Sequence, residues 1–118
     1  MNIDLHSHFF PIEALGNPGQ HRDKAPKVQL TNGRLTVSSG GGMRGNLGAG
    51  AYDAAARIQD LDKMSIDIQA ISPSPIMLFY WEEPAAASYF SRVVLYTRSS
   101  WSSRRLTRLG GMTVVSSP

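Results

Sequence analysis

The chain of 118 residues is long enough for one domain with a modest core, and the absence of cysteine excludes disulfides and thiolate metal sites. No basic-then-apolar leader opens the chain, and its longest apolar run, Ile76–Trp81, is far below the ~20 residues that span a bilayer. The net charge of +3 comes from residues 84–118, which hold five arginines and no acid, but no helix-turn-helix, zinc-finger or aromatic-basic motif indicates nucleic-acid binding. We therefore expect a cytoplasmic protein with neither a membrane nor a nucleic acid as its partner.

The chain opens with the segment MNIDLHSHFFP, in which polar and apolar residues alternate. This alternation predicts a short strand over residues 2–5, with Ile3 and Leu5 on one face. His6 and His8 follow two residues apart, so both imidazoles can point to one face and bind the same metal ion. Imidazole nitrogens are ligands that suit zinc. A bare histidine pair of this kind is more often two polar surface residues than a metal site. The rest of the chain must decide between these two interpretations.

Residues 27–37 read KVQLTNGRLTV, two β-prone runs around Asn32-Gly33. Both central residues of a type I′ turn need a positive φ, which Asn and Gly tolerate, so we expect an inserted β-hairpin over about residues 27–38. Residues 38–50 contain six glycines and are predicted to form a mobile loop.

Two helices and a second strand are predicted between residues 53 and 94. Asp53 can cap the first helix by accepting a backbone N–H, and period two from Ile66 to Ser72 predicts the strand. Pro84 suits the first turn of the second helix, which should run to about Val94. The residues expected to face the core are Ala54, Ala55, Ile58 and Leu61 of the first helix, Ile66, Ile68 and Ala70 of the strand, and Ala86, Phe90 and Val93 or Val94 of the second helix.

Beyond residue 94 the composition changes. The stretch LYTRSSWSSRRLTR is rich in Ser and Arg without a clean period, and the apolar piece LGGMTVV near the end is a candidate third strand. The order of strand, hairpin, helix, strand, helix and third strand is typical of a βαβ arrangement. The sequence therefore predicts an α/β fold with a parallel sheet.

Several of these features, in this order, resemble the amidohydrolase superfamily. Its members begin with I-D-x-H-x-H on the first strand, here Ile3–His8, and continue through a small β insertion and a helix of the R-I-x-x-M-D type, here Arg57-Ile58. A second strand then leads to a P-x-x-x-x-Y-W segment, here Pro75–Trp81. The match covers roughly residues 2–94 and looks like the branch that contains aminocarboxymuconate-semialdehyde decarboxylase.

The resemblance implies a (β/α)8 barrel of the TIM type with one divalent metal, usually zinc, for which His6 and His8 would be ligands. In the decarboxylases of this family a metal-bound water assists protonation of the carbon that loses CO₂, and in hydrolytic relatives it attacks the scissile bond. The implied substrate is a small carboxylated molecule, unsaturated or aromatic. A hydrolytic amidohydrolase and a small non-catalytic binding module that reuses the first strands remain as alternatives.

Three residues are assigned to the substrate by the same resemblance. Arg44 lies near the place where the inserted lobe of the family supplies an arginine to a substrate carboxylate, although the sequence favours an exposed loop arginine at this position. Tyr80 and Trp81 are expected either to wall the substrate pocket or to pack.

Three further polar residues lie in or near the matched motifs. Asp4 is expected to accept hydrogen bonds near the metal site, on the side of the strand that carries His6, without binding the metal. Arg57 is expected to make an ion pair or to cap a loop. His21 is the remaining imidazole and lies in an irregular segment.

A complete barrel takes ~200 residues or more, whereas this chain has 118. The other metal ligands of the family, a histidine and an aspartate, and its acid/base histidine lie on later strands without matching positions here, so no catalytic residue is assigned. We expect residues 1–94 to be the N-terminal part of a barrel, inactive by itself, with a homodimer as one assembly of the longer parent. An out-of-frame coding stretch would explain the divergent tail over residues 95–118.

Overall fold

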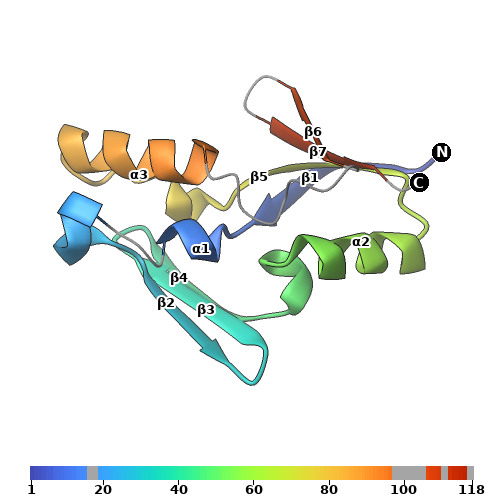
Figure 1. The fold of residues 1–118 in the computed structure, drawn as a ribbon, viewed down its shortest axis with the longest axis horizontal. Helices are drawn as coiled ribbons and strands as arrows, with labels where there is room; N and C mark the ends of the chain where they lie inside the picture. The colour runs from blue at the N-terminus through green and yellow to red at the C-terminus, as the bar shows by residue number, and fades with distance from the viewer. Residues whose placement is uncertain (16–18, 97–105, 110–111, 117–118) are drawn as a thin grey trace.

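The computed structural model describes residues 1–15, 19–96, 106–109 and 112–116 (Figure 1). Residues 97–105 of the Ser/Arg-rich tail lie outside these ranges, and the out-of-frame hypothesis stays a prediction. In chain order the elements, with η for 3-10 helices, are β1 (Ile3–Phe9), α1 (Ile12–Leu15), η1 (Gly19–Lys24), β2 (Lys27–Thr31), β3 (Arg34–Ser39), β4 (Gly42–Leu47), η2 (Ala49–Ala51), α2 (Ala54–Lys63), β5 (Ile68–Pro73), η3 (Pro75–Met77), α3 (Pro84–Tyr96), β6 (Leu106–Leu109) and β7 (Met112–Ser116).

Strands β1 and β5 lie side by side at one edge of a sheet with the order β1-β5-β7-β6 (Figure 1). They are parallel, as the βαβ order predicts, with His8 opposite Ser72. The predicted third strand is present as β7, but it runs antiparallel to β5 and also pairs with β6. The prediction of a wholly parallel sheet is therefore wrong. Because β6 ends at Leu109 and β7 begins at Met112, β7 enters the sheet as half of a hairpin, whereas a parallel pair needs a long crossover.

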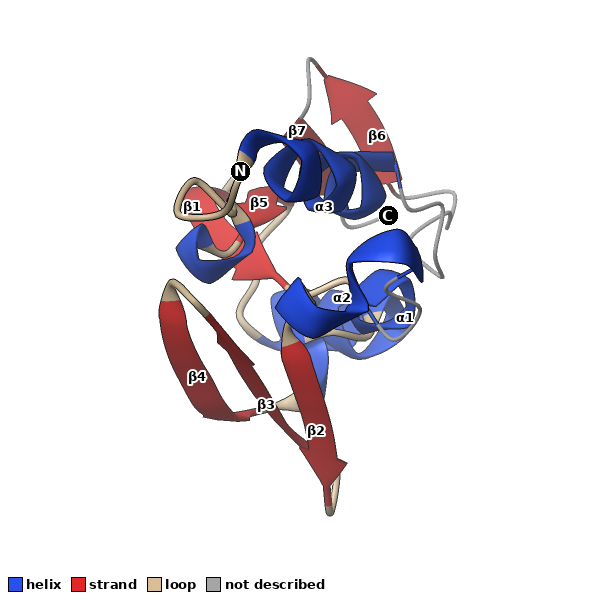
Figure 2. Ribbon diagram, turned by 90° about the vertical axis from the view of Figure 1, so that its left-hand side faces the viewer, coloured by secondary structure: helices blue, strands red, loops and turns tan. Residues whose placement is uncertain are grey.

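Strands β2, β3 and β4 form a second, antiparallel sheet, which we call the β-lobe (Figure 2). Asn32 and Gly33 have φ angles of 50° and 72°, which confirms the predicted turn. The predicted mobile loop over residues 38–50 is wrong, because β4 lies there and pairs with β3. Gly40 and Gly41 form a tight turn against the indole of Trp81, where a Cβ atom would collide. The glycines thus allow a close approach between two segments, and the strand that follows is ordered.

The larger core lies between the β-lobe, η3 and α3. Its buried residues are Phe10, Leu15, Leu35, Val37, Ile76, Met77, Phe79, Ala86, Phe90 and Val94. The predicted inward positions of α3 at Ala86, Phe90 and Val94 are confirmed, and the rings of Phe79 and Phe90 stack with centroids 4.9 Å apart. This core anchors the segment that directly follows the carboxyl ends of β1 and β5.

A smaller core packs α2 against β5 through Leu61 and Ile71. The helix begins at the predicted cap, since the Oδ1 atom of Asp53 accepts the backbone N–H of Ala56 at 2.9 Å. Ala55, predicted to face the core, is exposed, and Arg57 is buried instead.

The two apolar residues of the predicted first strand lie at the surface. Ile3 and Leu5 are 48% and 75% exposed, because β1 is an edge strand and the contacts with the two cores are made by Phe9 at its end and by Phe10 directly after it. Within the part of the chain that the structure describes, no helix is long and apolar enough to cross a membrane.

Candidate metal centre

Strand β1 presents its two histidines on the face turned away from α2. The Oγ atom of Ser7 accepts a hydrogen bond from Arg57 of α2, and Phe9 packs against the core that contains Leu61 of the same helix. Side chains alternate along a strand, so His8 lies on the opposite face. The ring of His6 contacts the ring of His8 edge to face, with centroids 4.9 Å apart and planes inclined at 78°. The structure therefore brings the two imidazoles together.

A β-bulge separates Asp4 from the histidine face. Asp4 pairs with Gln69 and Ser7 pairs with Ile71, so β1 has one residue more than β5 between these two pairs. The prediction that Asp4 lies on the side of His6 assumed strict alternation and is wrong, because the extra residue turns its carboxylate toward Gln69.

The Asp4 carboxylate accepts two hydrogen bonds, as expected. Its Oδ1 atom accepts the backbone N–H of His6 at 3.0 Å, and its Oδ2 atom accepts Nε2 of Gln69 at 2.6 Å. These hydrogen bonds lower the pKa of Asp4 from its ordinary value of 3.8. The bond from the His6 N–H has the larger effect, and the bond from the Gln69 amide has the second largest. An ionised Asp4 thus holds the backbone of the histidine segment in place.

Ser72 of β5 contacts the second histidine directly. Its Oγ atom lies 3.2 Å from Nδ1 of His8, across the parallel register that pairs the two residues. Ser72 has no predicted role in the site, because the sequence pattern shows it only as the last residue of the second strand. Only the register of the two strands places Ser72 beside His8, and a single sequence does not determine that register.

Arg57 connects α2 to both strands of the site. Its side chain is buried and donates to four oxygen atoms, those of the Gly50 carbonyl (2.7 Å), Ser7 Oγ (2.9 Å), Gln69 Oε1 (2.9 Å) and the His8 carbonyl (2.6 Å). Burial lowers the pKa of Arg57 from its ordinary value, and the charges of Asp4 and Asp60 act in the opposite direction. Arg57 therefore bonds to loop and strand oxygens, and the charges of Asp4 and Asp60 also act on it.

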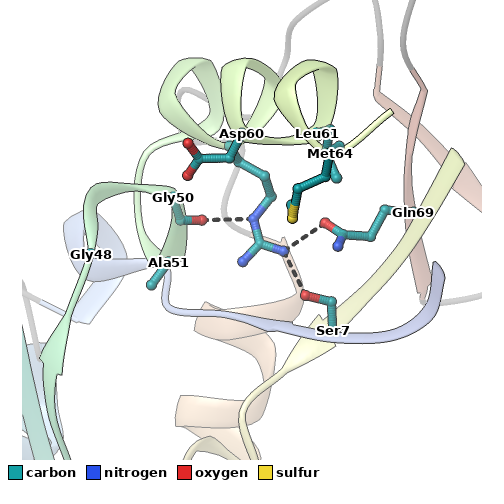
Figure 3. Close-up of a pocket in the computed structure, with 9 residues that line it drawn as sticks. Ser7, Gly48, Gly50, Ala51, Asp60, Leu61, Met64 and Gln69 are labelled. Carbon is teal, nitrogen blue, oxygen red and sulfur yellow. Dashed lines mark hydrogen bonds between the residues drawn. The ribbon is translucent and has the colours of Figure 1, made fainter. Parts of the chain in front are cut away.

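A cavity of about 260 Å³ lies beside the Arg57 side chain, between α2, the segment before it and β1 (Figure 3). Ser7, Gly50, Leu61 and Gln69 are among its lining residues. Because Ser7 marks the α2 side of β1, this cavity lies across the strand from the two histidines. Neither His6 nor His8 lines this cavity, so it is separate from the candidate metal centre.

The two aromatic residues assigned to the substrate lie near the carboxyl ends of β1 and β5. Trp81 packs on the larger core, which also contains Phe10, two residues beyond His8. Tyr80 is 78% exposed and contacts Trp81 edge to face. The Nε1 atom of Trp81 is buried without a hydrogen-bond partner among the described residues.

Arg44 lies on β4 of the β-lobe, with an exposed side chain. Its Nη1 atom donates to the carbonyl of Met43 at 2.9 Å. No hydrogen bond or ring contact among the described residues joins Arg44 to the histidine pair, so its role toward a substrate stays a prediction.

The residues present fit half of a metal site. His6 and His8 provide nitrogen ligands of the type that zinc accepts, but a catalytic zinc normally has three protein ligands. Within the described ranges, no group of three or more His, Cys, Asp or Glu side chains is arranged to hold a metal ion. His21 lies elsewhere, with its ring 5.3 Å from that of Tyr89 on α3.

No family model matches the chain. Its sequence is 26% identical over 102 residues to the 2-amino-3-carboxymuconate-6-semialdehyde decarboxylase of Caenorhabditis elegans. The alignment takes in 78% of this chain and 23% of the relative, so the chain spans about a quarter of the length of the curated protein that it matches. The chain is thus similar to part of a decarboxylase, and its helices and strands give it a mixed α/β content.

Proposed function

We propose that this chain forms the first strands of a metal-dependent, amidohydrolase-type barrel enzyme that decarboxylates a carboxylated unsaturated or aromatic small molecule. The observation that carries the proposal is the contact between the His6 and His8 rings near the carboxyl end of β1, beside the parallel strand β5. Active sites of parallel α/β enzymes lie at that end of their strands. The similarity to a decarboxylase supplies the class of reaction.

In this proposal His6 and His8 hold a divalent metal, and zinc is the ion that best suits imidazole ligands in a catalytic site. When bound, the metal would act as a Lewis acid and lower the pKa of a water ligand. Tyr80 and Trp81 form part of the wall of the substrate pocket, and Arg44 attracts the substrate carboxylate. The remaining ligands come from strands outside this chain.

Zinc titration of the full 118-residue chain tests the ligand assignment. We expect weak one-to-one binding, since two imidazoles replace the usual three protein ligands. His6→Ala and His8→Ala should each abolish this binding, whereas His21→Ala, the matched control, should leave it unchanged. Calorimetry measures the affinity and the stoichiometry of all four proteins.

Zinc binding that survives both His6→Ala and His8→Ala would contradict the assignment. Tight stoichiometric zinc in the isolated chain would contradict the account of an incomplete site. In a protein that joins this segment to a complete ligand set, release of CO₂ without consumption of water would distinguish decarboxylation from the hydrolytic alternative.

A further inference from the structure

We propose that Ser72 is a positioning residue that selects the tautomer of His8 and so leaves Nε2 of His8 as the metal-binding nitrogen. This inference rests on the proposed function, because it states which nitrogen of a proposed ligand is used. Ser72 lies on β5, outside the histidine motif itself.

The contact between Ser72 and His8 is linked to the position of the proton on the neutral imidazole. The Oγ atom of Ser72 is 3.2 Å from Nδ1 of His8. A serine hydroxyl can accept from a ring N–H or donate to a ring nitrogen, and these two arrangements require opposite tautomers. If Ser72 accepts, the proton is on Nδ1 and the Nε2 lone pair can bind a metal. If Ser72 donates, the proton is on Nε2, and this nitrogen then has no free lone pair with which to bind a metal.

The first arrangement is the one that suits a metal-binding histidine. Metal-binding histidines commonly donate their second ring N–H to a nearby oxygen, which fixes both the tautomer and the ring orientation. His8 is half-buried, and its carbonyl accepts Nη2 of Arg57 at 2.6 Å. Two different elements, β5 and α2, therefore hold the ring and the backbone of one residue, as a preformed ligand requires.

Nitrogen-15 NMR of the imidazole rings tests the tautomer on the full chain without metal, at a pH where His8 is neutral. We expect His8 to carry its proton on Nδ1 in the wild type and in Ser72→Thr, which keeps the hydroxyl. Ser72→Ala should shift the proton toward Nε2, and Ser88→Ala, an exposed serine of α3, should not. If the spectrum of the wild type shows that His8 is protonated on Nε2, that result alone overturns the proposal, whatever the variants show.

Zinc affinity gives the second readout. Ser72→Ala should weaken zinc binding by roughly 10- to 100-fold, the usual effect of removing an outer partner of a ligand, while Ser72→Thr should restore most of the affinity. If His8→Ala abolishes binding but Ser72→Ala retains both the affinity and the tautomer of the wild type, the Ser72 proposal fails and the proposed function stands. If neither His6→Ala nor His8→Ala changes zinc binding, the proposed function itself fails.

Discussion

Arg57 is the residue on which most of the site geometry depends. It lies on the buried side of α2 at a position where an amphipathic helix usually has an apolar side chain, and it bonds to oxygens of the segment before α2, of β1 and of β5. A buried guanidinium is stable only if its N–H groups are paired, so these contacts and the burial depend on each other. The backbone position of His8 is therefore coupled to the packing of α2.

Replacing Arg57 with lysine should destabilise the protein. Lysine has three donors on one nitrogen in place of five in a planar fork, so several of the buried oxygens would lose their partner, at about 1–3 kcal/mol each. We expect the free energy of unfolding in urea to fall by roughly 2–4 kcal/mol. Arg92→Lys on the exposed side of α3 is the control and should change it by less than about 0.5 kcal/mol. Equal midpoints for the two variants would contradict the structural role of Arg57.

The turn before β4 gives a second prediction at this scale. A Cβ atom on Gly41 would collide with the indole ring of Trp81, so Gly41→Ala should lower the stability by about 1–3 kcal/mol, as overpacking does. A Cβ atom on Gly45 would lie 3.4 Å from Oγ1 of Thr36, an ordinary contact, so Gly45→Ala is the matched control. Thermal unfolding measures both; a similar loss in each variant would show that the Trp81 contact is not the cause.

At the scale of elements, the sequence predicts correctly the features whose signals are local. The cap of α2 at Asp53, the inward positions of α3 and the turn at Asn32-Gly33 each depend on residues a few positions apart. The strand β4 was not predictable, because the turn before it depends on a contact with the indole of the distant Trp81. The direction of β7 follows from its hairpin with β6, a strand that begins in the stretch without a clean period. The same limit holds for the candidate site. A spacing of two residues brings the imidazoles of His6 and His8 together, whereas Ser72 and Gln69 join only through the register of two strands far apart in the chain.

The cap of α2 can be tested by itself. Asp53→Ala removes the acceptor of the Ala56 N–H and should cost about 0.5–2 kcal/mol of stability. Asp53→Asn keeps a side-chain oxygen at this position and should cost much less. Circular dichroism during urea unfolding compares the two; an equally large loss in both would indicate that charge, and not the hydrogen bond, stabilises this end of the helix.

At the scale of the whole molecule, the described chain leaves one edge of its sheet open. β1 is the outermost strand of the order β1-β5-β7-β6, and its Leu5 is 75% exposed. An exposed edge strand with apolar side chains is a template for pairing with other chains. This arrangement agrees with the proposal that further strands belong beside β1.

The open edge predicts self-association of the isolated chain. Leu5→Lys should reduce it, because a charge on an edge strand opposes edge-to-edge pairing. Leu78→Lys, at a residue 51% exposed outside the strands, is the control and should associate like the wild type. Sedimentation velocity over a concentration series measures the effect; a wild-type chain that stays monomeric throughout would contradict the prediction.

The pairing of β1 with β5 also has a consequence for how the protein tolerates changes in length. His8 and Ser72 are 64 positions apart, and the entire β-lobe lies within the chain segment that separates them. The entropy lost on closing a flexible loop grows only with the logarithm of its length, so doubling such a segment costs about 0.6 kcal/mol. Insertions and deletions at the tip of the β-lobe, around Gly33, should therefore accumulate with little effect on the histidine centre. A single added or deleted residue between Asp4 and His8 would change the bulge and disrupt that centre.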